Sequence, residues 1–394
     1  MIEARYCVMA TGCLSVPRDP DFEGADSFKG ERYETARWPH EPVDFTGKRV
    51  AVIGTGSSGT QAIPLIAKEA AQVYVFQRTP NFSVPARNKP LSDEDVAKFR
   101  QNFSAYRQLL KSDQPIAPLP PPDADLNDLA ARTWRGGGLY SVLGIPNLTR
   151  DEQVNQVVAD YIRGKIAEIV DDPDIAEKLT PRGYPVGSKR PCVDTDYFAT
   201  FNRENVELVD LRETPIAMIT PTGVRTSQSD YPVDVIVYAT GFDAMTGALL
   251  RIDIRGRNGI ALRDVWAAGP KTYLGLQVAG FPNLFTVTGP GSPSVLSNMI
   301  TSCEQHVDWI ADAIGYMREK GLATMEAGTD AQEAWVAHVN DEADKTLYPR
   351  ASSWYIGANV PGKPRVFMPY VGANYRTRCD AIAARGYEGF AFNR

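Results

Sequence analysis

The stretch RVAVIGTGSSGTQ, residues 49–61, constrains the fold of this chain more than any other. Its apolar start, Val50–Ile53, leads into three glycines spaced Gly-x-Gly-x-x-Gly and then into a segment of helical pattern. Gly54 permits a tight turn, Gly56 lets a pyrophosphate approach the backbone, and Gly59 lets the helix pack on the strand. The stretch therefore predicts a dinucleotide site at a helix N-terminus.

The side chains around this turn favour NADP(H) over NAD(H). The next apolar run, Val73–Phe76, is followed by Arg78 and Thr79, and no acid is present to bond the ribose hydroxyl of NAD. Arg78 can grip a 2′-phosphate with its planar fork and Thr79 can add a hydroxyl donor, although a solvated surface arginine is the alternative.

Strand-like and helical segments alternate along the chain, which predicts an α/β protein with parallel strands. Two short segments are similar: ARYCVMATG (4–12) and VDVIVYATGFD (233–243) each end an apolar strand in Ala-Thr-Gly. Ligands gather at such strand ends in open sheets, but either segment could be an ordinary turn. Between residues 91 and 180 the pattern becomes helical, which indicates an insertion.

Two helices are expected near the C-terminus. A helical stripe of apolar residues predicts that the first of them ends at Gly321. The stripe consists of Ile300, Cys303, Val307, Ile310, Ile314 and Met317. Thr329 and Gln332 offer a capping box for the second helix.

Composition argues against several kinds of partner. Of 394 residues 43% are apolar and 23% charged, and the net charge of −6 gives no general attraction to nucleic acid or anionic membrane. No apolar run reaches the roughly 18 residues that a membrane helix needs. The five cysteines are scattered, and His306, three residues after Cys303, lies in a helical pattern, so free thiols and no metal site are expected. These features predict a cytoplasmic protein.

The segment FKGERYETARWP, residues 28–39, resembles the fingerprint of Baeyer–Villiger monooxygenases, flavoproteins that insert oxygen beside a ketone carbonyl. Phe28, Gly30, Trp38 and Pro39 match it, whereas Glu34 stands where the family has histidine. Six further blocks resemble the family in order, closest to its phenylacetone and cyclohexanone branch. They are GTGSSGTQ, QRTPNF, KRPCVDTDYF, VIVYATGFDA, LGLQVAGFPNLFTVTGPGSPSVLSNM and SSWYIGANVPGKPR.

The resemblance implies two dinucleotide-binding, Rossmann-like domains, one for FAD and one for NADPH. Residues 13–230 would form the NADP domain with its helical insertion, and residues 1–12 and 231–394 would belong to the FAD domain. In the family the FAD glycine motif precedes the point where this sequence starts, so we expect an FAD domain that is incomplete at its N-terminus. A fragment, a natural truncation and a separately encoded FAD segment all fit this pattern.

The resemblance also implies roles for single residues. Four of them fit the pyrophosphate cradle: Thr55, Ser57, Ser58 and Gln61. Arg190, in SKRPC, corresponds to the active-site arginine beside the flavin, and Lys189 to the lysine that contacts the 2′-phosphate, although the two could form an exposed loop pair. Trp354 resembles a loop tryptophan that folds over the bound cofactor, or else is a core residue. The implied reaction converts a small ketone, with NADPH and O₂, to an ester or lactone. Oxidation of amine nitrogen or sulfide, and a non-catalytic NADP-binding remnant, are the alternatives.

Overall fold

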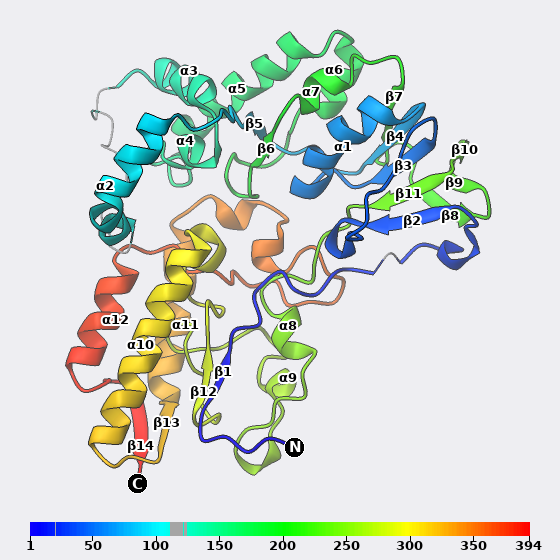
Figure 1. Ribbon diagram of the computed structural model, residues 1–394. Helices are drawn as coiled ribbons and strands as arrows, with labels where there is room; N and C mark the ends of the chain where they lie inside the picture. The colour runs from blue at the N-terminus through cyan, green and yellow to red at the C-terminus, as the bar shows by residue number, and fades with distance from the viewer. Residues whose placement is uncertain (20, 111–120, 122–123) are drawn as a thin grey trace. The chain divides into compact units, whose positions relative to one another are not determined.

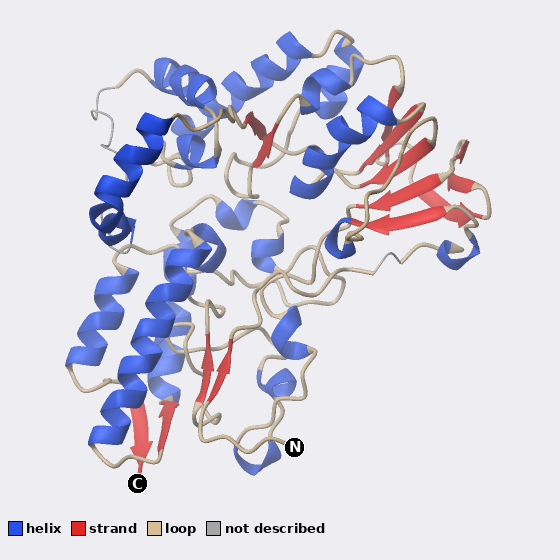
Figure 2. Ribbon diagram, in the orientation of Figure 1, coloured by secondary structure: helices blue, strands red, loops and turns tan. Residues whose placement is uncertain are grey.

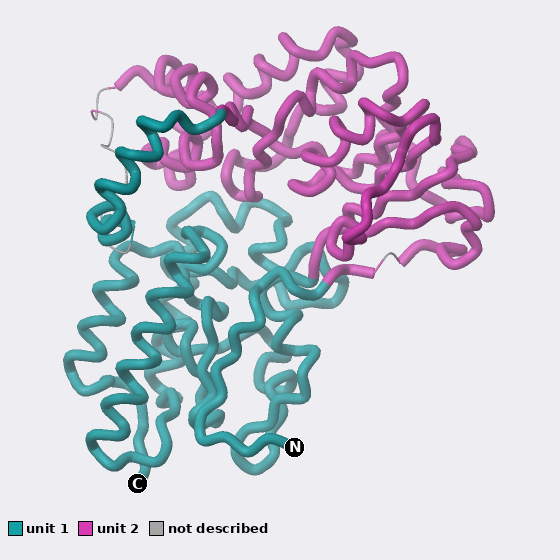
Figure 3. The backbone as a smooth tube through the Cα atoms, in the orientation of Figure 1, with its two compact units in different colours: residues 1–16, 90–119, 243–394 teal, residues 17–89, 120–242 magenta. Residues whose placement is uncertain are grey.

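The computed structural model describes residues 1–19, 21–110, 121 and 124–394, and the chain divides into two compact units (Figure 3). Unit 1 contains Met1–Val16, Pro90–Leu119 and Asp243–Arg394, and unit 2 contains Pro17–Lys89 and Pro120–Phe242. This division splits the expected helical insertion, because residues 90–119 group with unit 1. The assignment of FAD and NADP domains to segments of the chain remains a proposal.

A parallel sheet forms the centre of unit 2 (Figures 1 and 2). Its strands lie in the order β2-β11-β3-β4-β7, and every neighbouring pair is parallel. The strands are β2 (Glu31–Glu34), β11 (Val235–Tyr238), β3 (Arg49–Ile53), β4 (Gln72–Gln77) and β7 (Val206–Asp210). Val50 lies opposite both Val73 and Val235, and the apolar runs of β3 and β11 are buried, as in sheets covered on both faces. The expected α/β fold with parallel strands is confirmed.

Helix α1 (Ser57–Glu69) joins β3 to β4 and contacts both strands. It also packs on β6, which pairs in parallel with β5. Aspartates cap three of the insertion helices by accepting first-turn N–H groups, which fixes where those helices begin. The remaining elements of unit 2 are η1 (Ala25–Ser27), η2 (Thr35–Arg37), β5 (Ser83–Pro85), α3 (Leu126–Gly136), α4 (Leu139–Leu143), α5 (Glu152–Ile169), α6 (Pro173–Leu179), β6 (Cys192–Asp194), α7 (Tyr197–Thr200), and an antiparallel sheet of β8 (Ile216–Thr220), β9 (Gly223–Thr226) and β10 (Asp230–Pro232).

Unit 1 is mainly helical, and more than one apolar cluster packs between its elements. Two strand pairs accompany the helices: β1 (Cys7–Met9) runs parallel to β12 (Leu284–Thr286), and β13 (Thr324–Ala327) runs antiparallel to β14 (Phe390–Asn393). The helices are α2 (Asp93–Leu110), α8 (Gly247–Leu250), α9 (Leu262–Val265), α10 (Met299–Glu319), α11 (Thr329–Asp344) and α12 (Tyr375–Ala384), with short turns η3 (Arg257–Gly259), η4 (Ser294–Leu296), η5 (Tyr348–Arg350) and η6 (Trp354–Ile356). Among the described residues, no helix is long and apolar enough to cross a membrane.

Two local expectations for unit 1 are wrong in detail. The stripe on α10 is rotated, because Ile300 and Val307 are exposed while His306 is fully buried. The capping box is not formed: Gly328 is the N-cap of α11, and the Oε1 atom of Gln332 accepts the N–H of Ala279 at 2.8 Å. In both cases a tertiary partner outside the helix decides the outcome.

Candidate functional site

The glycine turn between β3 and α1 combines two crowded positions with one open position. Gly54 has φ +110°, and a β-carbon there would lie 2.5 Å from the carbonyl oxygen of Ala239. A β-carbon on Gly59 would lie 2.2 Å from the carbonyl oxygen of Gly54. At Gly56 a β-carbon would have no described atom within 4 Å. The chain's own packing therefore requires glycine at positions 54 and 59, whereas the open space at Gly56 leaves room for a ligand.

The first turn of α1 is exposed and its N–H groups are available. Gly56 is the N-cap, and no side chain of the described residues caps this turn. Ser57, Ser58 and Gln61 are exposed, and the Nε2 of Gln61 donates to the carbonyl of Ser57 at 3.0 Å. The positive end of the helix dipole is therefore presented to solvent, where an anion would be stabilised.

Thr55 faces the interior of the turn. Its Oγ1 donates to the carbonyl of Thr79 at 3.4 Å. Its own carbonyl accepts from Asn81 Nδ2 at 2.6 Å and from Thr60 Oγ1 at 3.3 Å. The Thr55 side chain thus shapes the turn and ties it to the segment after β4.

Two cations lie near one another beyond the end of β4, and neither has an anionic partner among the residues that the structure describes. Arg78 is exposed and makes no hydrogen bond or ion pair with the residues that the structure describes. Lys189 places its Nζ 4.6 Å from the ring centroid of Tyr184. Burial, and then the positive charge of Arg78, lower the pKa of the Lys189 ammonium. Repulsion of this kind is relieved when an anion binds between the charges.

Arg190 lies between this pair of cations and β6. Its charge, together with hydroxyls of Ser57 and Thr60, opposes the effect of burial, which raises the pKa of the Cys192 thiol. Arg190 comes just before β6, and β6 packs on α1. Arg190 is therefore held near the N-terminus of α1, directly after the glycine turn. Unit 2 therefore brings together all the predicted site residues except Trp354.

Trp354 belongs to unit 1, where it begins η6. Its ring centroid lies 4.4 Å from that of Tyr355, and it packs half-buried against an apolar cluster that includes Phe367 and Met368. The core interpretation of this residue and the cofactor interpretation are both compatible with this partial burial.

The fingerprint segment is built into unit 2 around β2. Phe28 is buried, and a β-carbon on Gly30 would lie 2.3 Å from the carbonyl of Asp234. Glu34, at the position of the family's histidine, pairs with Arg37 at 2.6 Å. Trp38 packs on Tyr33 with ring centroids 5.5 Å apart. The segment is thus a local packing motif in which Glu34 makes an ion pair.

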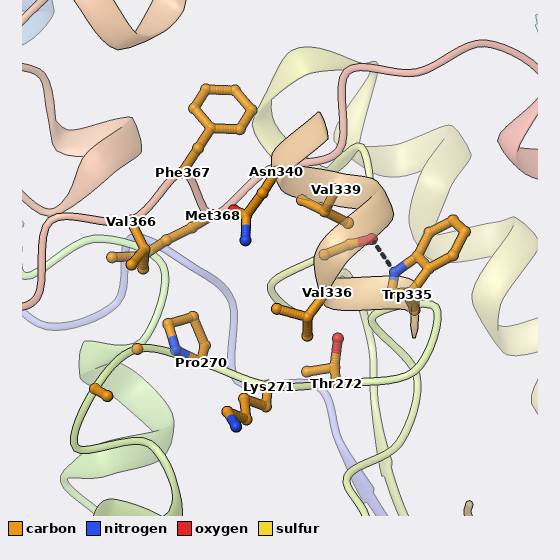
Figure 4. Close-up of a pocket in the computed structure, with 13 residues that line it drawn as sticks. Pro270, Lys271, Thr272, Trp335, Val336, Val339, Asn340, Val366, Phe367 and Met368 are labelled. Carbon is orange, nitrogen blue, oxygen red and sulfur yellow. Dashed lines mark hydrogen bonds between the residues drawn. The ribbon is translucent and has the colours of Figure 1, made fainter. Parts of the chain in front are cut away.

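No predicted site residue lines either of two hollows among the described residues of unit 1. One has a volume of about 180 Å³ and lies between α11 and the 268–272 and 366–368 segments (Figure 4). Its floor is apolar, with Val336 and Val366, and Lys271 at its edge is paired with Glu333 at 2.8 Å. The other, of about 460 Å³, lies between α11 and α12.

Two residues that shape the site were not predicted from the sequence, Asn81 and Tyr184. Asn81, which braces the turn, lies in the block QRTPNF that the resemblance had drawn attention to. Tyr184, under the Lys189 ammonium, carries no sequence signal, because a contact across a loop leaves no periodicity.

Comparisons with known proteins agree with this geometry. A family model described as pyridine nucleotide-disulphide oxidoreductase matches residues 1–108. A Baeyer–Villiger monooxygenase of Pseudooceanicola batsensis is 39% identical over 408 residues, which cover 100% of this chain and 74% of that protein. Cyclohexanone 1,2-monooxygenase of Acinetobacter sp is 39% identical over 402 residues, covering 98% of this chain and 73% of that protein.

A solved structure of an oxidized steroid monooxygenase bound to NADP is also similar, with a TM-score of 0.92 and 45% identity. The match covers 99% of this chain and 75% of that one. The chain thus spans about three quarters of the length of these proteins. None of these matches supports a separately encoded FAD segment. This chain belongs to the Baeyer–Villiger monooxygenase family.

Proposed function

We propose that this chain acts as an FAD- and NADPH-dependent monooxygenase that uses O₂ to convert a small ketone to an ester or a lactone. The family supports the reaction type. The observation that carries the cofactor choice is the pair of cations, Arg78 and Lys189, beside an open glycine turn.

The residues of unit 2 fit NADP(H). The pyrophosphate would lie over Gly56 and accept from the N–H groups of Ser57, Ser58 and Gly59, where the helix dipole favours negative charge. The 2′-phosphate would be bound by Arg78, Lys189 and the Thr79 hydroxyl. Its negative charge would neutralise the two positive charges, which otherwise repel each other.

FAD, when bound, supplies the oxygen-transferring chemistry. We assign Arg190 the role of a fixed cation that stabilises the negative charge developing during oxygen transfer, because a planar guanidinium can donate several hydrogen bonds to an anion. Trp354 would cover the bound nicotinamide cofactor. Residues 13–230 would form the NADP domain, and residues 1–12 and 231–394 would belong to the FAD domain.

We also propose a cytoplasmic location. None of the five cysteines, all of which the structure describes, forms a disulfide, and Cys7 and Cys303 are at least partly accessible, which suits a reducing compartment.

Arg78→Ala tests the cofactor choice. Loss of a charge-assisted contact costs about 1.5 to 3 kcal/mol, so NADPH binding should weaken roughly ten- to hundredfold while NADH binding barely changes. Arg378→Ala is the matched control, because Arg378 is also exposed and makes no side-chain ion pair within the described part of the chain. Equal losses for both cofactors, measured by calorimetric titration, would exclude a 2′-phosphate role.

Arg190→Ala tests the chemistry. In enzyme loaded with FAD, the variant should retain flavin and NADP⁺ but lose ester formation, with NADPH oxidised and hydrogen peroxide released. Product analysis with a cyclic ketone, an amine and a sulfide separates the proposed reaction from nitrogen or sulfur oxidation. A normal ester yield from the variant would show that Arg190 is not needed.

A further inference from the structure

The segment that follows Trp354 folds back on itself as a compact loop within unit 1. The N–H of Gly357 donates to the carbonyl of Trp354 at 3.2 Å, and that of Ala358 donates to Ser353 at 3.0 Å. The guanidinium of Arg365 donates to the carbonyl of Gly357. These bonds keep the loop compact, but they do not attach it to the rest of the unit.

A buried cation adds an attachment to residues outside the loop. The Lys363 side chain is only 9% exposed, and its Nζ lies 2.6 Å from Asp243 Oδ1 and 2.5 Å from the carbonyl oxygen of Ala244. A buried ammonium is costly unless it is paired, and removing either partner leaves a charge without compensation. The pair therefore holds the loop in one position rather than adding to general stability.

The other end of the attachment is rigid. The backbone N–H of Asp243 donates to Val16 at 2.8 Å, and that of Met245 donates to Cys13 at 2.8 Å. The Asp243 carboxylate lies against Gly247, in space that a side chain there would need, since a β-carbon on Gly247 would come within 2.6 Å of Asp243 Cγ. Asp243 is thus a fixed point to which the loop is held.

The near end of the loop carries Trp354. Tyr355, next to it, is buried, and its carbonyl accepts the N–H of Met368 at 3.0 Å. Trp354 itself is half-buried and packs on Tyr355. A loop fixed at Tyr355 and at Lys363 leaves the indole little freedom to move away.

We propose that Lys363 and Asp243 are positioning residues that hold the Trp354 loop in the conformation that receives NADP(H). The inference rests on the proposed function for the role of Trp354. It assigns a task to a charge pair that lies outside the residues proposed for cofactor binding and chemistry.

Limited proteolysis with chymotrypsin tests whether the pair holds the loop. Lys363→Met, which keeps the aliphatic stem, should be cut after Trp354 or Tyr355 about tenfold faster than the parent chain. Lys345→Met is the matched control, because it breaks an exposed ion pair with Glu342 in the same unit and should leave cleavage at these sites unchanged. Equal cleavage rates for parent and Lys363→Met would overturn the attachment.

A double-mutant cycle on the FAD-loaded enzyme tests whether the pair acts through Trp354. Lys363→Met should weaken NADP⁺ binding about tenfold in the parent and add nothing in a Trp354→Ala background, whereas Lys363→Arg should restore binding. The same added loss in both backgrounds would overturn the inference. Arg78→Ala distinguishes failure of the positioning role from failure of the cofactor proposal. If Arg78→Ala weakens NADPH binding while Trp354→Ala leaves NADP⁺ binding unchanged, only the positioning role fails. If Arg78→Ala has no effect, the cofactor proposal fails.

Discussion

Strands β11 and β1 are each followed by the same tripeptide, Ala-Thr-Gly, yet they have very different surroundings. β11 lies between β2 and β3, and all its residues are buried. β1 pairs with β12 in a two-stranded sheet, and Val8 at its centre is 44% exposed. An apolar run with a glycine ending therefore specifies a strand, while its burial depends on how many strands and helices pack around it.

The loop that follows β11 and the loop that follows β12, the partner of β1, are also fixed by different means. After β11, the backbone of Ala239 lies close against Gly54. The two backbones can approach this closely only because Gly54 has no side chain. Past β12, Thr288 has φ +53°, and its N–H donates to the buried Nδ1 of His306 at 2.8 Å. One region depends on the absence of side chains and the other on a buried titratable group.

The largest effect is expected where glycine is required. Gly54→Ala places a β-carbon 2.5 Å from the Ala239 carbonyl at φ +110°, so steric overlap adds to backbone strain. Together these should lower the free energy of unfolding by about 3 kcal/mol or more and abolish NADP⁺ binding. Urea unfolding and titration with NADP⁺ measure both effects.

Gly47→Ala is the control for this prediction. Gly47 also has a positive φ, +71°, but a β-carbon there meets no atom within 4 Å, so only strain of about 1 kcal/mol is expected. If both variants lose the same stability, the contact with Ala239 does not matter and the turn is held by conformation alone.

These two glycines illustrate what the sequence could and could not predict. The spacing of Gly54, Gly56 and Gly59 predicted the turn correctly, because only a few backbone conformations satisfy it. Periodicity placed a helix over α10 but misjudged its buried face. A pattern of apolar residues does not reveal that His306 is matched by partners from distant segments, and the same limit applies to Gln332 on α11.

Acid should affect the β12 region next most strongly. Because Thr288 donates to Nδ1, neutral His306 carries its proton on Nε2, which lies 2.9 Å from the Tyr375 hydroxyl. Burial lowers the pKa of His306 to about 4, below the ordinary 6.5. A protonated Nδ1 could no longer accept the N–H of Thr288.

The sign of the effect follows from that pKa. Between pH 6.5 and about 4 the unfolded chain binds the proton and the folded chain does not, so stability is complete above 6.5 and falls as the pH drops towards 4. The loss should reach about 3 kcal/mol. Unfolding of unit 1, followed by hydrogen exchange, should show this slope, and His306→Gln should remove it. An unchanged slope in the variant would assign the acid sensitivity to other groups.

The smallest effect concerns the two strands themselves. Val237, in β11, is fully buried, so Val237→Thr places a hydroxyl of similar size where no water can reach it, at a cost of about 1 to 3 kcal/mol. The same change at Val8, in β1, leaves the hydroxyl solvated because that side chain is 44% exposed, and stability should change by less than about 0.5 kcal/mol. Thermal unfolding of the two variants, each against the parent, provides the comparison. A comparable loss of stability at Val8 would mean that β1 is covered in solution. The difference between β11 and β1 would then lie in their sequences rather than in their burial.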